Sequence, residues 1–421
     1  MTEGSSAAVE AVWRLESARI IAAVARLVRD VGLAEELAQD AFVAALQQWP
    51  TSGVPPNPGA WLMVVAKHRA IDRLRRDDRL KGKTAQLATD AQRDQLVAGL
   101  SDSTGAETDE LRDDVVRLVF VACHPVLSVE ARAALTLRVV AGLSITEIAR
   151  AYFVAEPTLA QRIVRAKRAL RHHRVPFEVP AAAEWGERLA SVLEVIYLTF
   201  NEGYTATEGD RWMKPELCYE ALRLGRTVAE LMPDEPEVHG LVGLMELQAS
   251  RLPARVLPSG EPIPLLEQDR GRWDQLLIRR GFEAVLRAEG TARPVGRYVI
   301  QAAIAACHAR ARSADETDWA QITSLYSVLS QLTPTPVVAL NRAVAVAMSA
   351  GPAHGLELVD ELVDEPALRN SHLLPSVRAD LLVRLGRVNE ARTEYQRAAS
   401  LTRNERERAS LLARAEFCGN P

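Results

Sequence analysis

The segment LSITEIARAYFVAEPTLAQRIVRAKRALRHHR, residues 143–174, contains the start and stop signals of two short helices. Ser144 and Glu147 have the spacing of a capping box, in which each side chain satisfies a free backbone amide at the start of a helix. We expect this helix to end near Tyr152 and residues 153–155 to form a turn, after which Pro157 stands where the first turn of a helix tolerates proline. Apolar residues then recur at helical spacing: Leu159, Ile163, Ala166 and Leu170. Two helices joined by a three-residue turn are typical of a helix-turn-helix.

The second of these helices is basic on the face that its apolar residues do not occupy. Residues 161–174 contain six Lys/Arg and no acidic residue. Because the second helix of this motif lies in the major groove of DNA, the residues on the outward face and its flanks are candidate DNA contacts: Thr158, Gln161, Arg162, Arg165, Lys167 and Arg168. A plain helical hairpin has the same pattern, so the motif alone leaves both interpretations open.

Two further helices and a loop are predicted upstream of this segment. Apolar residues recur at helical spacing over residues 20–31 and again over residues 38–49. Gly32 is expected to end the first helix, and Pro50 is expected to break the second. The three prolines and two glycines of residues 51–59 (TSGVPPNPG) predict a loop.

A third upstream helix is expected to begin near Ala60. Its second part, residues 67–83, holds eight Lys/Arg, which suits contacts with phosphates. Trp61 stands beside the loop and suits stacking on unpaired bases. The alternative is a solvated basic helix end with Trp61 in the core.

Composition divides the chain into segments. Residues 86–114 contain eight acidic residues against Arg93 and Arg112, which predicts a solvated linker. Residues 175–180 (VPFEVP) mark a second boundary, and strand patterns with period two are absent, so we expect an all-α fold. Residues 1–175 carry 24 Lys/Arg and 21 Asp/Glu, whereas residues 176–421 carry 27 and 34. A polyanion is therefore expected to bind the first part.

Cysteine usage and motif content argue against several classes of protein. The four cysteines are far apart without a CxxC pair, so neither a disulfide framework nor a zinc module is indicated. No glycine-rich phosphate loop, HExxH or GxSxG motif occurs, and we predict no enzyme activity, catalytic residue, cofactor or metal. There is no signal-peptide pattern and no run of about 18 apolar residues. We expect a cytoplasmic protein that does not bind a membrane.

These segments together resemble the extracytoplasmic-function (ECF) group of the sigma-70 superfamily. Residues 34–43 (AEELAQDAFV) look like its region 2.2, residues 61–76 (WLMVVAKHRAIDRLRR) like its regions 2.3 and 2.4, and residues 143–170 like its region 4.2. The segments occur in the family's order, with no region 3 between them. Residues 120–125, residues 160–167 and the long helical tail are similar to a subgroup with a C-terminal tetratricopeptide-like (TPR-like) extension.

The resemblance implies a sigma factor that brings core RNA polymerase to promoter DNA. Region 2.2 would hold the clamp helices of the polymerase β′ subunit through polar residues: Glu36, Gln39, Asp40 and Gln47. The next helix would hold the unpaired −10 element through Trp61, Lys67, His68, Arg69, Arg73 and Arg76. Region 4 would read the −35 element with the candidate contacts given above and dock on the β flap, and the acidic linker would run toward the RNA path. Phe153 stands where the family usually has glycine, a departure that changes the turn before the recognition helix.

The tail, residues 176–421, carries weak helical repeats. The TPR pattern matches from its middle onward at Ala379, Leu382, Leu385, Gly386, Ala391, Tyr395 and Ala398. A degenerate copy over residues 340–359 precedes it, and we expect residues 180–330 to add further stacked helices. Polar groups at residues 201–204, 267–270, 308, 318–319 and 341–342 lie among apolar residues. They either line a pocket for a ligand or peptide or cap helices and satisfy one another.

The predicted organisation is region 2 over residues 1–85, the linker over 86–112, region 4 over 113–175 and the extension over 176–421. We hypothesise that the extension regulates the sigma factor through a regulatory protein or ligand. The rival hypothesis is a one-component regulator, in which a TPR-like sensor is fused to a helix-turn-helix that binds duplex DNA without polymerase. That hypothesis leaves residues 15–85 without a role. A scaffold without a DNA role would be indifferent to charge reversal at Arg165 and Arg168.

Overall fold

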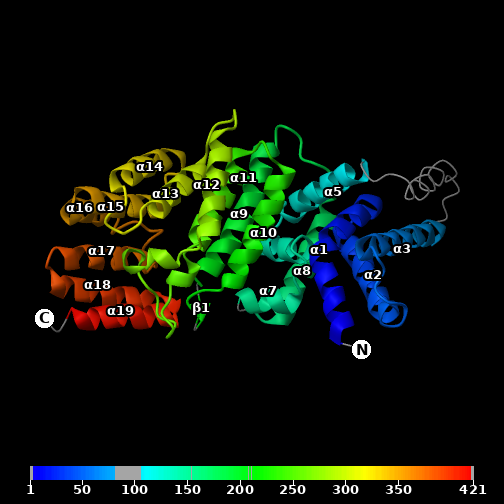
Figure 1. Ribbon diagram of the computed structural model, residues 1–421, viewed down its shortest axis with the longest axis horizontal. Coiled ribbons are helices and arrows are strands. Elements are labelled where there is room, and N and C mark those ends of the chain that lie inside the picture. The colour runs from blue at the N-terminus through cyan, green and yellow to red at the C-terminus, as the bar shows by residue number, and fades with distance from the viewer. Residues whose placement is uncertain (1–2, 81–105, 153, 207, 210, 419–421) are drawn as a thin grey trace. The chain divides into compact units, whose positions relative to one another are not determined.

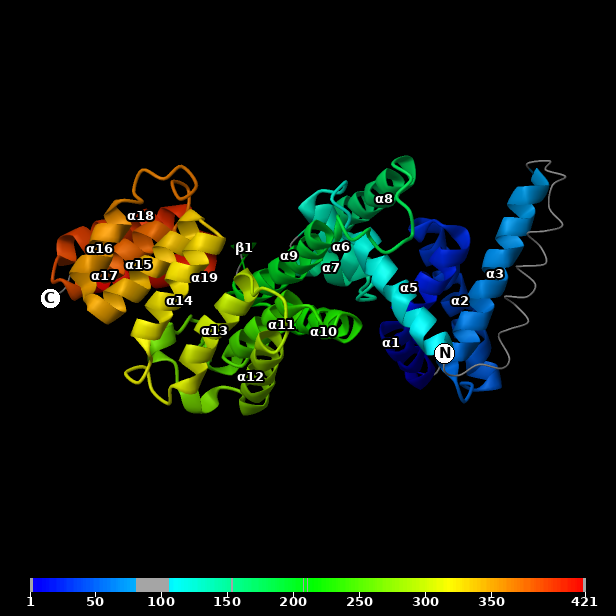
Figure 2. The same cartoon turned by 90° about the horizontal axis from the view of Figure 1, so that it is seen from above.

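The computed structural model of the chain describes residues 3–80, 106–152, 154–206, 208–209 and 211–418. The chain divides into two compact units, residues 1–195 (unit 1) and 196–421 (unit 2), and each is described by itself. Helices form nearly all of the regular structure in both, as Figures 1 and 2 show. The all-α prediction is therefore confirmed.

Three long helices form the first part of unit 1. They are α1 (Glu3–Val28), α2 (Val31–Ser52) and α3 (Pro58–Leu80), and each packs against the other two. Ile20 and Leu62 are fully buried between them. The helical spacing of the apolar residues thus provides the core of this bundle.

The junction between α1 and α2 differs from the prediction, because α1 ends at Val28 and not at Gly32. Arg29 adopts a left-handed backbone conformation (φ 53°) that stops the helix. Asp30 then caps α2, since its carboxylate accepts a hydrogen bond from the Leu33 amide at 3.0 Å. Gly32 lies inside the first turn of α2.

The predicted break at Pro50 is also wrong, because α2 continues to Ser52. A proline has no backbone N–H, so Pro50 removes one hydrogen bond of the helix, but the helical conformation continues for two more residues. Gly53 (φ 80°) ends the helix, and its amide donates to the Trp49 carbonyl at 3.0 Å. The loop expected over residues 51–59 is therefore reduced to residues 53–57.

The second part of unit 1 contains α5 (Ala106–Ala122), α6 (Val129–Val139), α7 (Ile145–Tyr152) and α8 (Glu156–His172). α5 contacts α1 and lies alongside it in Figure 2. It begins inside the segment predicted as an acidic linker, so residues 106–112 are helical. The rest of that segment, residues 86–105, lies outside the described residues.

α7 and α8 form the predicted helix-turn-helix. The capping box is confirmed: the Ser144 amide donates to the Glu147 carboxylate at 2.8 Å, and the Glu147 amide donates to Ser144 Oγ at 3.1 Å. α7 ends at Tyr152 as predicted, and Pro157 lies in the first turn of α8. Phe153, the departure from the family pattern in the turn, lies outside the described residues.

Unit 2 begins inside α9 (Trp185–Tyr204), whereas the extension was predicted to begin at residue 176. The first half of α9 belongs to unit 1 because its side chains bond there. Arg188 Nη2 donates to the Phe120 carbonyl at 2.7 Å, and the Ser191 hydroxyl donates to the Cys123 carbonyl at 2.6 Å.

The rest of unit 2 is a succession of helices, as expected for residues 180–330 and beyond. After α9 come α10 (Pro215–Leu231), α11 (Pro236–Ala249), the short 3-10 helices η2 (Leu252–Ala254), η3 (Leu265–Glu267) and η4 (Arg270–Arg272), α12 (Gln275–Glu289), α13 (Arg297–Arg310), α14 (Trp319–Leu332), α15 (Pro336–Ala350), α16 (Pro352–Asp360), α17 (Leu373–Arg384), α18 (Val388–Leu401) and α19 (Glu405–Phe417).

The last helices pack as hairpins, which Figure 1 shows for α17, α18 and α19. Gly386 (φ 73°) forms the turn between α17 and α18, a conformation that favours glycine. Five positions of the repeat pattern are buried in the core of these helices: Ala379, Leu382, Ala391, Tyr395 and Ala398.

A two-residue parallel ribbon joins the beginning and the end of unit 2. β1 (Glu208–Gly209) pairs with β2 (Arg403–Asn404). Asn404 is 1% exposed, and its side-chain amide donates to the carbonyls of Ala206 at 3.0 Å and Arg211 at 2.9 Å. Its side-chain oxygen also caps α19.

Candidate nucleic-acid interface

The outer face of α8 presents polar and basic side chains to solvent. Its apolar residues are buried as predicted, and the exposed candidates are Thr158, Gln161, Arg165 and Arg168. Arg165 Nη2 donates to Gln161 Oε1 at 3.2 Å, so these two side chains lie next to each other. Val164, which the list of candidate contacts left out, is 51% exposed on the same face. It adds an apolar group of the kind that contacts thymine methyls.

The other two predicted −35 contacts are placed differently. Arg162 is half-buried. Lys167 is directed toward α2, where its ammonium group forms an ion pair with Glu35 and only 19% of its side chain is exposed. A buried carboxylate requires a countercharge, and Lys167 supplies it, so this side chain does not share the open face with Arg165.

Glu35, a residue not predicted from the sequence, holds three helices of this unit together. It is 2% exposed, and besides Lys167 its carboxylate accepts hydrogen bonds from Arg138 Nε at 2.6 Å and Gln39 Nε2 at 2.5 Å. Its position among the buried residues of α2 was the available signal, because a charge on an apolar helix face needs a partner. Glu35 thereby joins α2 to α6 and α8.

Asp30 makes a second connection of this kind. Arg171 Nε of α8 bonds to its carboxylate. Burial opposes ionisation of Asp30, but the hydrogen bonds from Arg171 and the Leu33 amide outweigh that effect, so the pKa of Asp30 is below its usual value. The hydrogen bond to Asp30 in turn raises the pKa of Arg171. Within unit 1, α8 is thus joined to α2 through two acidic residues, Glu35 inside α2 and Asp30 at its N-cap.

The basic side of α3 carries the predicted −10 contacts. Trp61 is half-buried, with its ring edge-on to Trp49 at a centroid distance of 5.5 Å. His68, Arg73 and Arg76 are exposed, whereas Lys67 and Arg69 are half-buried. Arg69 Nη1 lies 3.6 Å from Asp40 Oδ2, which connects the predicted −10 segment to the predicted polymerase-binding segment.

The predicted polymerase-binding residues share one side of α2. Glu36, Asp40 and Gln47 are exposed, and Gln39 is half-buried because it donates to Glu35. Val43 and Leu46 are 49% and 37% exposed beside them. These two residues were not predicted from the sequence, and exposed apolar side chains within a polar rim are typical of a protein-binding surface.

Models of two protein families match this unit. Sigma-70 region 2 matches residues 13–80, and Sigma-70, region 4, matches residues 117–170. The ECF RNA polymerase sigma factor SigK of Mycobacterium ulcerans (strain Agy99) is 29% identical over 165 residues, which cover 37% of this chain and 79% of SigK. SigX of Bacillus subtilis (strain 168) is 26% identical over 150 residues, which cover 35% of this chain and 73% of SigX. The chain belongs to the ECF group of the sigma-70 family.

The similarity of this sigma factor to other proteins extends through its tail. An uncharacterized protein of Rhizobium meliloti (strain 1021) is 42% identical over 394 residues, which cover 92% of this chain and 90% of that protein. A family of unknown function, DUF6596, matches residues 188–289. No solved structure matches the chain. Within the described residues, this sigma factor has no helix that is long and apolar enough to cross a membrane.

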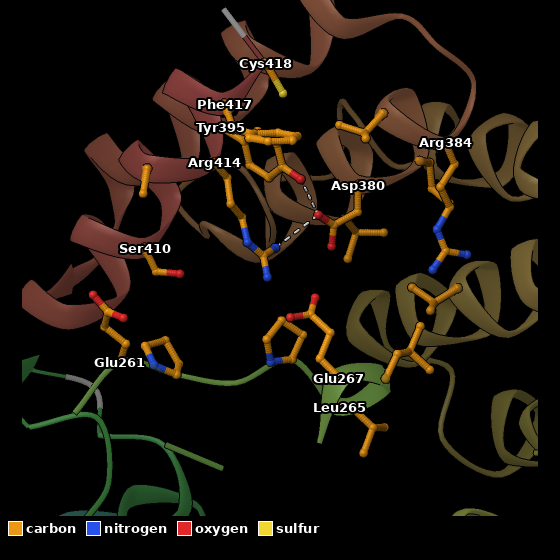
Figure 3. Close-up of a pocket in the computed structure, with 18 of the residues that line it drawn as sticks. Glu261, Leu265, Glu267, Asp380, Arg384, Tyr395, Ser410, Arg414, Phe417 and Cys418 are labelled. Carbon is orange, nitrogen blue, oxygen red and sulfur yellow. Dashed lines mark hydrogen bonds and ion pairs between the residues drawn. The ribbon is translucent and has the colours of Figure 1, made fainter. Parts of the chain in front are cut away.

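Unit 2 of this sigma factor contains a groove of about 810 Å³, lined by residues 257–267 and by side chains of α15, α17, α18 and α19. Figure 3 shows Asp380 between Tyr395 and Arg414 in this groove. The Tyr395 hydroxyl donates to Asp380 Oδ1 at 2.5 Å, and Arg414 Nη1 donates to the same oxygen at 3.2 Å. Phe417 is 81% exposed at one end of the groove.

Some of the polar groups predicted in the tail cap helices, and others line a groove or a cavity. Asp318 caps α14 by accepting from the Gln321 amide at 2.9 Å, which is a structural role. Glu267 and Trp319 line the groove. Four others line a separate cavity of about 260 Å³: Asn201, Tyr204, His308 and Asn341.

The pair Cys123 and His124 has a structural role in the turn after α5. Cys123 is buried with its sulfur 3.2 Å from the Thr136 hydroxyl, and burial raises the pKa of its thiol to about 11. His124 Nδ1 accepts from the Val126 amide at 3.1 Å. A thiol with so high a pKa is unreactive near neutral pH.

Proposed function

We propose that this sigma factor binds core RNA polymerase, directs transcription initiation at specific promoters, and is regulated through unit 2. The observation that carries the proposal is the order of the two family matches in unit 1, each of which carries exposed basic residues on a helix. The role of each side chain is part of the proposal.

The proposal assigns one surface to each step. The exposed side of α2, with Glu36, Asp40, Gln47, Val43 and Leu46, contacts the clamp helices of the β′ subunit. α3 contacts the unpaired −10 element. α8 enters the major groove of the −35 element, and region 4 docks on the β flap. The groove in unit 2 supports the regulatory part, because a cavity of about 810 Å³ is large enough for a small ligand or a peptide segment.

Reconstitution with core polymerase tests the first part. The full chain is expected to bind core polymerase and to produce transcripts from a subset of genomic promoters. Glu36→Lys combined with Gln47→Lys is expected to lower the affinity for core polymerase by about tenfold or more, because it reverses the charge of the α2 surface. The matched control is Glu283→Lys, on an exposed position of α12.

Two outcomes would contradict this part of the proposal. One is the absence of transcripts from every promoter. The other is duplex DNA binding by the full chain together with no measurable affinity for core polymerase, which would favour a one-component regulator.

The regulatory part requires a comparison with a shortened chain. A chain that ends after Tyr204 keeps all of α9, whose first half bonds to α5 in unit 1. Circular dichroism first checks that this shortened chain is helical. Its promoter-specific activity is expected to differ from that of the full chain, and equal activity of the two would contradict regulation by unit 2.

A further inference from the structure

The cavity of about 260 Å³ in unit 2 is lined by polar side chains from five helices. They are Tyr197, Asn201 and Tyr204 of α9, Gln248 of α11, Gln301 and His308 of α13, Tyr326 of α14 and Asn341 of α15. Arg251, which follows α11, completes the polar wall, and Leu265 lines both this cavity and the groove of Figure 3. Cores of helical proteins are normally apolar, so this convergence of polar groups requires an explanation.

Arg251 lines the cavity, and two more arginines bond to residues that line it, Arg255 to Tyr204 and Arg270 to His308. None of the three forms an ion pair within 4 Å among the described residues. Arg251 donates to the Tyr204 hydroxyl and to Gln248 Oε1, and Arg255 donates to the Tyr204 carbonyl and to Thr205 Oγ1. Arg270 donates to the carbonyls of His308 at 2.7 Å and Ala311 at 2.9 Å and to Thr317 Oγ1 at 2.9 Å. All of these acceptors are neutral.

The contrast with other charges of unit 2 shows that this pattern is unusual. Lys214, which is 1% exposed, pairs with Glu202, and Glu246, also 1% exposed, pairs with Arg226. Burial lowers the pKa of Arg255 and of Arg270, because desolvation destabilises the charged form of each side chain; at Arg270 the carboxylate of Glu316 opposes this effect without cancelling it. An anion in the cavity would supply a countercharge to Arg251, the arginine that lines it.

Two buried polar groups on the cavity wall have unused hydrogen-bonding atoms. His308 is 9% exposed, and its Nδ1 has no hydrogen-bond partner in the described structure. The ring packs edge-on against Trp319, and burial together with Arg251 and Arg270 lowers its pKa to about 3, so the imidazole is neutral and can donate one hydrogen bond. Arg251 Nε is likewise buried without an acceptor.

We propose that this cavity binds a small organic anion that carries a carboxylate group. Arg251 pairs with the carboxylate, His308 donates to it, and the neighbouring amide and hydroxyl groups hold the polar remainder of the molecule. The volume is slightly below the range of about 300–1,000 Å³ that is usual for ligand pockets, so the ligand is a small metabolite and not a nucleotide. Such a ligand would be a signal for the regulation proposed above, but its binding does not depend on that proposal.

Thermal unfolding of the full chain tests the proposal, with succinate, L-glutamate and inorganic phosphate as probes at constant ionic strength. Succinate or glutamate is expected to raise the melting temperature, because a ligand that binds the folded chain stabilises it. Arg251→Met is expected to weaken the binding measured by calorimetry about 30-fold or more, the usual consequence of removing one partner of a buried charge pair. The control Arg287→Met, on the exposed side of α12, is expected to bind as the unchanged chain does.

His308→Leu is the second variant, in case Arg251→Met does not fold. The His308 side chain forms no hydrogen bond to any described residue, so its replacement removes ligand contacts without breaking an internal bond. A loss of affinity with unchanged stability supports the site. Three results would overturn the proposal: no shift with either carboxylate, a shift with phosphate alone, or carboxylate binding that both variants leave unchanged.

Discussion

Single residues of α8 differ in what they contact, although they lie close together in the sequence. Arg165 is exposed beside Gln161, whereas Lys167 pairs with Glu35 of α2. The two side chains leave the helix in different directions because successive residues are about 100° apart. Arg165 is available to contact DNA. Lys167 would have to break its ion pair with Glu35 before it could pair with a DNA phosphate.

Arg165→Ala is therefore expected to weaken binding to the −35 element by about 1–3 kcal/mol if the guanidinium contacts a base. Fluorescence anisotropy with the cognate and a scrambled duplex measures the change, and Arg287→Ala is the matched control. An equal loss on both duplexes would show that Arg165 contacts phosphate only.

Asp30→Asn tests the ion pair with Arg171 without removing the cap of α2, because asparagine also caps helices. The folded-state pKa of Asp30 is lowered, so its contribution to stability is present above the unfolded-state pKa of about 3.9 and is lost as the pH falls through the lower folded-state value. We expect the variant to be less stable by up to about 1 kcal/mol at pH 7, since Arg171 is exposed and the pair is screened. Urea unfolding at several pH values should show this difference shrink below about pH 4. A difference that is constant with pH would contradict the assignment.

At the scale of helices, the residues just outside the helix ends determine where the elements begin. Ser144 at α7 and Asn404 at α19 have the same local role, but only Asn404 is also bonded to a distant part of the chain. Removing the cap at Asn404 is therefore expected to lower the free energy of unfolding more than removing the cap at Ser144.

Ser144→Ala is expected to destabilise unit 1 by about 1 kcal/mol, because it removes the hydroxyl that accepts a hydrogen bond from the Glu147 amide at the start of α7. Ser144→Thr keeps the hydroxyl and should retain most of the stability. Denaturant unfolding measures both, and equal losses for alanine and threonine would show that the hydroxyl is not the relevant group.

Asn404→Ala is expected to cost more, about 2–4 kcal/mol, because it removes a helix cap and leaves the carbonyls of Ala206 and Arg211 without this donor. Hydrogen exchange at the start of α19 should accelerate. Asn389→Ala, at an exposed position of α18, is the control and should change stability by less than about 0.5 kcal/mol.

For the whole molecule, charge is distributed unevenly around a net value of −4. Attraction to DNA must therefore come from local basic surfaces, since the chain as a whole is repelled by phosphate. The exposed basic residues of α3 and α8 are such surfaces, and their effect depends on salt.

Promoter affinity is expected to fall steeply as salt rises, because each neutralised phosphate releases a counterion. The double change Arg165→Ala and Arg168→Ala should lower the slope of log affinity against log salt by about two if both side chains contact phosphates. Titrations at several salt concentrations measure the slope. An unchanged slope would place α8 away from the DNA backbone.

Features that depend on neighbouring residues could be predicted from the amino-acid sequence alone. The capping box at Ser144, the turn at Gly386 and the buried faces of the helices follow from local hydrogen bonds and helical spacing. The predicted ends of the first two helices were wrong. Periodicity does not detect the left-handed backbone of Arg29, which ends α1, or the continuation of α2 past Pro50.

Contacts between groups that are far apart in the sequence depend instead on how the helices pack. Glu35 receives Lys167 and Arg138, and Arg251 and His308 line one cavity, because long-range packing of helices brings these groups together. A buried charge has no local sequence signature for its partner, since the partner can lie on any element that packs against it. The exposed basic face of α8 could thus be predicted from the sequence, whereas the partner of Lys167 and the polar cavity of unit 2 could not.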